Sequence, residues 1–192
     1  MRNLIVLFFL VLSLSMAQAK KTMVLIAYHS LTGNTKAMAE AVAEGAATVP
    51  QVEARLINIK KVKRKDILSA DAIIVGSPVH NANITPAVQR FINNWPFKNS
   101  PLKNKLGAAF VSAGGISAGE ELAQMNILHS MLIYNMIVIG GADWKSAFGA
   151  SAIVEEMPFK RRDGEKDLQK QFILKARALG ERVARISQML SE

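Results

Sequence analysis

The chain has no cysteine among its 192 residues. This absence excludes disulfide bonds, a thiolate nucleophile and metal sites built on thiolates. It also leaves no thiol that an oxidising compartment could oxidise. Redox activity, if this chain has any, would therefore need a bound cofactor.

Acidic residues are few relative to basic ones, because 15 Asp and Glu stand against 24 Lys and Arg, for a formal net charge of +9. Much of the excess lies in two runs, residues 60–65 and 160–162. Neither run is interleaved with aromatic residues, so we expect no binding to nucleic acid. Each run is either a solvated loop or a contact for anions, and residues 60–65 are a candidate for loose association with an anionic surface.

Long hydrophobic runs are absent except at the N-terminus. Residues 1–19 contain Arg2, a mostly apolar stretch from Leu4 to Met16 and an Ala-Gln-Ala cleavage site that ends at Ala19, which is typical of a secretory signal peptide. We expect cleavage there and export to the periplasm or out of the cell. The alternative is an uncleaved membrane anchor, although the stretch is short for a bilayer span. Residues 20–192 suffice for a single domain and are too few for two.

Candidate strands and helices alternate along the rest of the chain, which predicts an α/β fold with a doubly wound parallel sheet. The second candidate strand alternates apolar and polar residues, as an edge strand does, whereas the other four are nearly continuous apolar runs. This pattern suits a five-stranded parallel sheet in the order 2-1-3-4-5. The candidate strands are 22–28, 52–59, 71–77, 106–112 and 136–141, and the candidate helices are 35–48, 86–95, 119–134 and 166–190.

A polar loop joins the first strand to the first helix, and its residues are Ser30, Leu31, Thr32, Gly33, Asn34 and Thr35. The loop ends at a helix N-terminus, where unpaired N–H groups and the helix dipole favour an anion. Hydroxyl and amide side chains add donors, and the glycine permits close approach and a positive φ. Because no Lys or Arg lies in the loop, it is unlike a Walker A site and favours a monophosphate held by neutral donors. The alternative is an ordinary capped turn.

This loop matches the T/S-x-T-G-x-T phosphate loop of flavodoxins, and most of residues 22–154 resemble the flavodoxin-like FMN-binding proteins. Residues 76–83, Gly-Ser-Pro-Val-His-Asn-Ala-Asn, are similar to the G-[ST]-P-x-x-x-G-N segment of the NAD(P)H:quinone oxidoreductases related to the tryptophan-repressor-binding protein. The resemblance implies a flavodoxin-like, three-layer fold. In such a sheet the ligand binds beyond the carboxyl ends of the strands, where the strand order reverses.

The resemblance places two further segments against the flavin. The residues it assigns are Ser77, Pro78, Val79, His80 and Asn83 after the third strand, and Ser112, Ala113, Gly114 and Gly115 after the fourth. Asn81 and Ala82 stand where the family usually has an aromatic residue and a glycine. The charges in the flavin segments are only Glu120 and Glu121.

The function implied by the resemblance is an FMN-dependent oxidoreductase that passes electrons from NAD(P)H, its co-substrate, to a quinone or a similar small acceptor. We assign no catalytic acid or base and no metal site. Quinone reductases of this type are commonly multimeric, so a homo-oligomer is an expectation as well. Two alternatives stay open, namely a flavodoxin-type electron-transfer protein without nicotinamide activity and a flavin-storage protein without turnover.

Overall fold

The structure is a computed structural model that describes residues 21–160 and 168–191. Its strands form one sheet in the order β2-β1-β3-β5-β6, in which β4 also pairs with β3 and β7 also pairs with β5. Every pairing is parallel except the short antiparallel one between β3 and β4. The strands are β1 (Thr22–Tyr28), β2 (Val52–Asn58), β3 (Ala72–His80), β4 (Asn83–Ile84), β5 (Leu106–Ala113), β6 (Ile137–Val138) and β7 (Ala150–Ile153).

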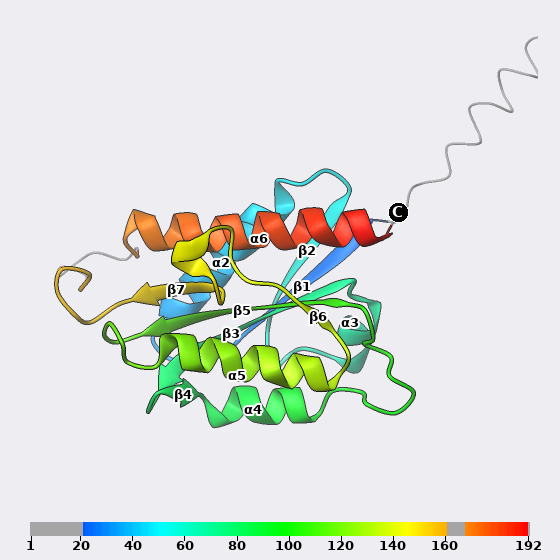
Figure 1. The fold of residues 1–192 in the computed structure, drawn as a ribbon, viewed down its shortest axis with the longest axis horizontal. Coiled ribbons are helices and arrows are strands. Elements are labelled where there is room, and N and C mark those ends of the chain that lie inside the picture. The colour runs from blue at the N-terminus through cyan, green and yellow to red at the C-terminus, as the bar shows by residue number, and fades with distance from the viewer. Residues whose placement is uncertain (1–20, 161–167, 192) are drawn as a thin grey trace, which may run out of the picture.

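Helices cover both faces of the sheet, so the molecule has three layers (Figure 1). The helices are α2 (Asn34–Ala47), α3 (Arg64–Ser69), α4 (Pro86–Asn93), α5 (Glu120–Ile133) and α6 (Lys170–Ser191). One face packs against α2 and α6 through a buried cluster that includes Met38, Phe110 and Leu179. The other face packs against α3, α4 and α5 through a cluster that includes Leu25 and Ile127. The predicted α/β fold with a parallel sheet is thereby confirmed.

The predicted count of five strands is wrong, because the structure has seven. One extra strand is β4, which turns the expected loop after β3 into a hairpin. The other arises because two short strands share the position beside β5. β6 pairs with the start of β5, and β7 pairs with its end. The predicted strand 136–141 is thus reduced to two residues.

Between β6 and β7 the chain leaves the sheet and forms a 3-10 turn, η1 (Trp144–Ser146), as Figure 1 shows. It returns through Gly149, whose φ is 137°. A Cβ at this glycine would collide with the carbonyl of Ala109 on β5, so the close return requires glycine. The apolar run near 136–141 gave no sign of this interruption, because periodicity does not report where a strand stops pairing.

The basic run 60–65 is only partly a loop, because Arg64 and Lys65 form the first turn of α3, a helix that the sequence analysis did not predict. In the part of the chain that the structure describes, no helix combines the length and apolarity needed to cross a bilayer. The predicted signal peptide, residues 1–19, and residues 161–162 of the second basic run lie outside the described residues.

Candidate functional site

Three segments meet at one edge of the sheet, because β1, β3 and β5 are neighbours and run in the same direction. We call residues 29–35 the phosphate loop, residues 77–85 the hairpin segment and residues 112–119 the glycine segment. Each begins at or near the carboxyl end of its strand. This edge is where ligands bind in open α/β sheets.

The phosphate loop has the backbone geometry that its sequence predicts. Gly33 caps α2 with a φ of 92°, and its N–H donates to Oγ of Ser30 over 3.1 Å. The first hydrogen bond of the helix runs from the N–H of Ala37 to the carbonyl of Gly33, 3.0 Å apart. The N–H groups of residues 34–36 therefore precede the bonded part of the helix, and no side chain among the described residues caps them. They are donors for an anion.

The side chains of this loop divide into outward and inward ones. Leu31 is exposed, and so is Thr32, whose Oγ1 accepts from Nδ2 of Asn34 over 3.1 Å. Asn34 is buried, and its Oδ1 has no hydrogen-bond partner among the described residues. Thr35 is buried as well, and its Oγ1 lies 2.8 Å from Oγ of Ser112 in the glycine segment. This contact thus connects the phosphate loop directly to the glycine segment.

The hairpin segment differs from the plain loop that the sequence predicts. Residues 77–80 continue β3, and β4 returns beside them through a turn at Asn81 and Ala82, which have φ values of 50° and 58°. Of the predicted flavin residues here, Ser77 is buried, Pro78 and Val79 are half-buried, and His80 and Asn83 are exposed near the tip. The Oγ of Ser77 accepts from the N–H of Thr85, 3.1 Å away.

His29 links the phosphate loop to the hairpin segment, and the sequence analysis did not identify this role. Its Nδ1 lies 3.0 Å from Oγ1 of Thr85, and both residues are buried. Burial lowers the pKa of His29, and the nearby Lys60 ammonium lowers it further. A neutral imidazole beside a buried hydroxyl therefore joins these two segments. The only signal in the sequence was a histidine directly after a buried strand.

The glycine segment contacts two glutamates from the chain after β7, Glu155 and Glu156, which no pattern in the sequence placed here. The N–H of Ile116 donates to Oε2 of Glu156 over 2.6 Å, and a Cβ at Gly115 would lie 2.7 Å from that same oxygen. The N–H groups of Glu155 and Glu156 both donate to the carbonyl of Gly114 over 3.0 Å. Besides Glu120 and Glu121, two further carboxylates therefore lie against this segment. Residues 155–156 follow β7, whose position beside β5 was not predicted.

The hairpin and glycine segments touch as well. Gly119 has a φ of 96° and is the N-cap of α5, and a Cβ at this position would collide with the backbone and side chain of Ala82. In addition, Nδ2 of Asn126 on α5 donates to Oδ1 of Asn83 over 2.7 Å. Each of the three segments is therefore fixed to the other two. The structure brings together all fifteen predicted residues within these segments.

The residues present suit FMN. A terminal phosphate matches the free N–H groups of the α2 N-terminus and the neighbouring hydroxyls. The buried, unpartnered Oδ1 of Asn34 is costly by itself and accepts readily from a ribityl hydroxyl. Gly114 and Gly115 have no Cβ atoms to hinder the close approach of a ring to the backbone.

Comparison with known proteins supports the same conclusion. The sequence pattern of the NADPH-dependent FMN reductase family matches residues 61–150. A flavodoxin from Aquifex aeolicus is 34% identical over 169 residues, with 84% of each chain covered. The chain belongs to the flavodoxin-like family of FMN proteins. An NAD(P)H dehydrogenase (quinone) from Archaeoglobus fulgidus is 27% identical, and the match covers 87% of this chain and 98% of that protein.

Solved structures give this flavodoxin-like chain the same fold. A flavodoxin, WrbA-like protein from Agrobacterium tumefaciens has a TM-score of 0.70 at 20% identity, with 88% of this chain and 99% of that one covered. Family membership supports FMN as the cofactor and an oxidoreductase as the broad class. The assignment of individual residues to the flavin stays a prediction.

Proposed function

We propose that this flavodoxin-like chain is an FMN-dependent enzyme that passes electrons from NAD(P)H to a quinone or a similar small acceptor. The observation that carries the proposal is the lack of Phe, Tyr and Trp in the phosphate loop, the hairpin segment and the glycine segment. A ring held by these segments is not stacked by a Phe, Tyr or Trp side chain from them. The ring face that such a side chain would cover stays open to a planar donor or acceptor.

When bound, FMN would supply the redox chemistry: it would accept a hydride from the nicotinamide and a proton from solvent, and would pass two electrons and two protons to the acceptor. The chain contributes binding and orientation. The α2 N-terminus binds the phosphate, and the bonds from His29 to Thr85 and from Thr35 to Ser112 hold the segments in register. The backbone of Gly114 and Gly115 lies beside the ring edge. Relatives named NAD(P)H dehydrogenase (quinone) support this reading.

A second candidate, electron transfer between proteins without nicotinamide activity, has its own support. Four carboxylates, from Glu120, Glu121, Glu155 and Glu156, lie in or against the glycine segment or at the start of α5. Acidic groups around a redox site steer basic partner proteins towards it. A relative named flavodoxin, from Aquifex aeolicus, matches most of the chain.

One anaerobic experiment separates the two. FMN-loaded protein is mixed with NADPH or NADH, with and without a benzoquinone, and nicotinamide oxidation is followed at rising ionic strength. If the chain is an enzyme, we expect nicotinamide oxidation whose rate falls as salt screens the attraction between the basic protein and the anionic dinucleotide. If the flavin stays oxidised with both nucleotides, yet a protein reductase reduces it, the electron-carrier function replaces the enzyme.

We also propose that this activity is exported, on the strength of the signal-like residues 1–19. The intact mass of the exported protein tests this point. A chain beginning at Lys20 agrees with the proposal, whereas a chain that retains residues 1–19 indicates a membrane anchor instead.

A further inference from the structure

A groove of about 460 Å³ lies between α3 and α4, on the face of the sheet opposite α2. Its apolar wall includes Ile59 directly after β2, Ile67 on α3 and Phe91 on α4. The first two are buried and Phe91 is half-buried. Volume and lining fall in the range of sites for small organic ligands. The three segments of the candidate flavin site do not line it.

The rim of this groove is strongly basic. Lys60, Arg64 and Arg90 line it and are exposed, and none of its lining residues among those described is acidic. Within the described residues, none of these three cations takes part in an ion pair. Two come from the β2–α3 side and one from α4, so positive charge faces the groove from both walls.

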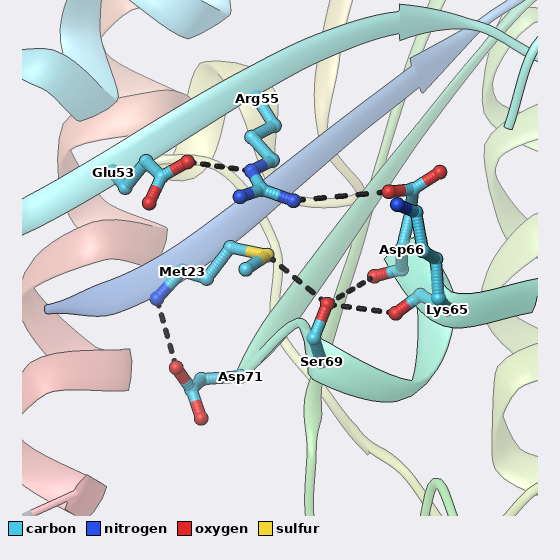
Figure 2. Close-up of polar contacts among 7 residues, drawn as sticks. All are labelled: Met23, Glu53, Arg55, Lys65, Asp66, Ser69 and Asp71. Carbon is cyan, nitrogen blue, oxygen red and sulfur yellow. Dashed lines mark hydrogen bonds and ion pairs between the residues drawn. The ribbon is translucent and has the colours of Figure 1, made fainter. Parts of the chain in front are cut away.

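The carboxylates closest in sequence to this rim are already engaged. Figure 2 shows Arg55 of β2 lying between Glu53 and Asp66. Its guanidinium is 3.7 Å from Oδ1 of Asp66, whose Oδ2 accepts from the N–H of Lys63 over 2.8 Å. These contacts fix α3 against the sheet and leave the groove cations for an external anion.

One end of the groove is close to the candidate flavin site. The N–H of Ile59 donates to the carbonyl of Tyr28 over 2.9 Å, so Lys60 follows at the same sheet edge as the phosphate loop. The charge of Lys60 lowers the pKa of His29, the first residue of that loop. On the other wall, α4 begins immediately after Thr85, the partner of His29.

We propose that this basic groove binds a nucleoside diphosphate group, namely the adenosine end of NAD(P)H. Three cations on two walls suit a ligand with at least two negative charges, since a single carboxylate would leave cations of one wall without a partner. The half-buried ring of Phe91 and the aliphatic side chains suit a flat apolar base. The statement that the ligand belongs to the reductant NAD(P)H rests on the proposed function, whereas binding of a nucleoside diphosphate in the groove does not.

Calorimetric titration of FMN-loaded protein with ADP and with inorganic pyrophosphate tests the proposal. We expect ADP to bind more tightly than pyrophosphate. Phe91→Ala should weaken the binding of ADP and leave the binding of pyrophosphate unchanged. Arg64→Ala and Arg90→Ala should each weaken ADP about tenfold, as expected for a lost charge-assisted hydrogen bond. Lys65→Ala is the matched control, because it removes one charge from the same basic run outside the groove lining.

The proposal is overturned if wild-type protein does not bind ADP, if pyrophosphate binds as tightly as ADP, or if the control loses as much affinity as the groove variants. Steady-state kinetics add a second readout, because groove variants should raise KM for NADPH about tenfold and leave kcat and the FMN Kd unchanged. An unchanged KM contradicts the groove site and leaves the proposed enzyme standing. Normal ADP binding without any reduction of the flavin by NADPH contradicts the enzyme and leaves the nucleotide site standing.

Discussion

The side chains of Thr35 and Ser112 are joined by a buried hydrogen bond of 2.8 Å, although 77 residues separate them in the chain. Thr35 lies in the first turn of α2, and Ser112 lies near the carboxyl end of β5. The bond therefore connects the segment predicted to bind the phosphate with the segment predicted to meet the ring. It fixes the distance between two parts of the site that must bind one ligand.

We predict that Thr35→Val and Ser112→Ala each weaken FMN binding about tenfold, because each leaves one hydroxyl buried without its partner. The double variant should lose much less than the product of the two single losses, since both remove the same bond. Flavin fluorescence quenching measures the four affinities, with Ser130→Ala as a control whose hydroxyl bonds only its own helix. Losses that simply multiply would show that the bond does not couple the two segments.

Gly33 tests the phosphate loop through its backbone. Its φ is 92°, but a Cβ there would meet nothing within 4 Å, so the requirement is conformational rather than steric. We expect Gly33→Val to weaken FMN binding strongly, Gly33→Asn to be tolerated better because Asn adopts positive φ more readily, and Asn34→Ala to fall between them. Equal affinities for the Val and Asn variants would contradict this explanation.

The sequence predicted the elements that form the interior and the sheet edge that carries the site. Buried strands such as β1 and β5 are continuous apolar runs, and their spacing from helices fixes a parallel sheet. The phosphate loop was predictable because the features that define it, Gly33 and the N-terminus of α2, lie next to each other in the sequence. The half-buried β2 showed its edge position in the same direct way.

What the sequence did not show depends on contacts between distant segments. Glu156 reaches the glycine segment only because β7 pairs with β5, and His29 meets Thr85 only once β3 and β4 form their hairpin. The strands β6 and β7 share one position in the sheet because each pairs with a different part of β5, and the periodicity of side chains does not report backbone pairing. Helix α3 is too short, at six residues, to show a clear period.

The backbone conformation of Ala82 destabilises the fold, and one substitution should relieve this strain. Its φ of 58° is a left-handed conformation that disfavours a residue with a Cβ. Ala82→Gly should raise the free energy of unfolding by about 1 kcal/mol, as measured by urea denaturation. Ala178→Gly, the same change inside α6, should instead lower it by about 1 kcal/mol. If both variants lose stability alike, the hairpin turn is not strained as described.

His29 should make stability depend on pH. Burial and then Lys60 lower its pKa below the ordinary 6.5, so the native state favours the neutral ring. As pH falls below this value, the unfolded chain takes up a proton that the native state refuses, and the free energy of unfolding decreases by at most about 1.4 kcal/mol per pH unit. The loss levels off once pH falls below the native pKa.

The variant His29→Gln removes this titration while keeping a polar side chain next to Thr85. Urea unfolding of both proteins between about pH 7.5 and pH 5 measures the difference. We expect the wild type to lose more stability than the variant over this interval. Parallel curves would show that His29 does not titrate differently in the folded and unfolded chains.

The central claim is that the phosphate loop binds the terminal phosphate of FMN, and titration of the apoprotein with FMN and with riboflavin tests it most directly. The two flavins differ only in that phosphate, so its contacts with the α2 N-terminus appear as the ratio of the two dissociation constants. We predict that FMN binds at least about a hundredfold more tightly, as several hydrogen bonds to a charged group imply. Equal affinity for FMN and riboflavin would contradict the account.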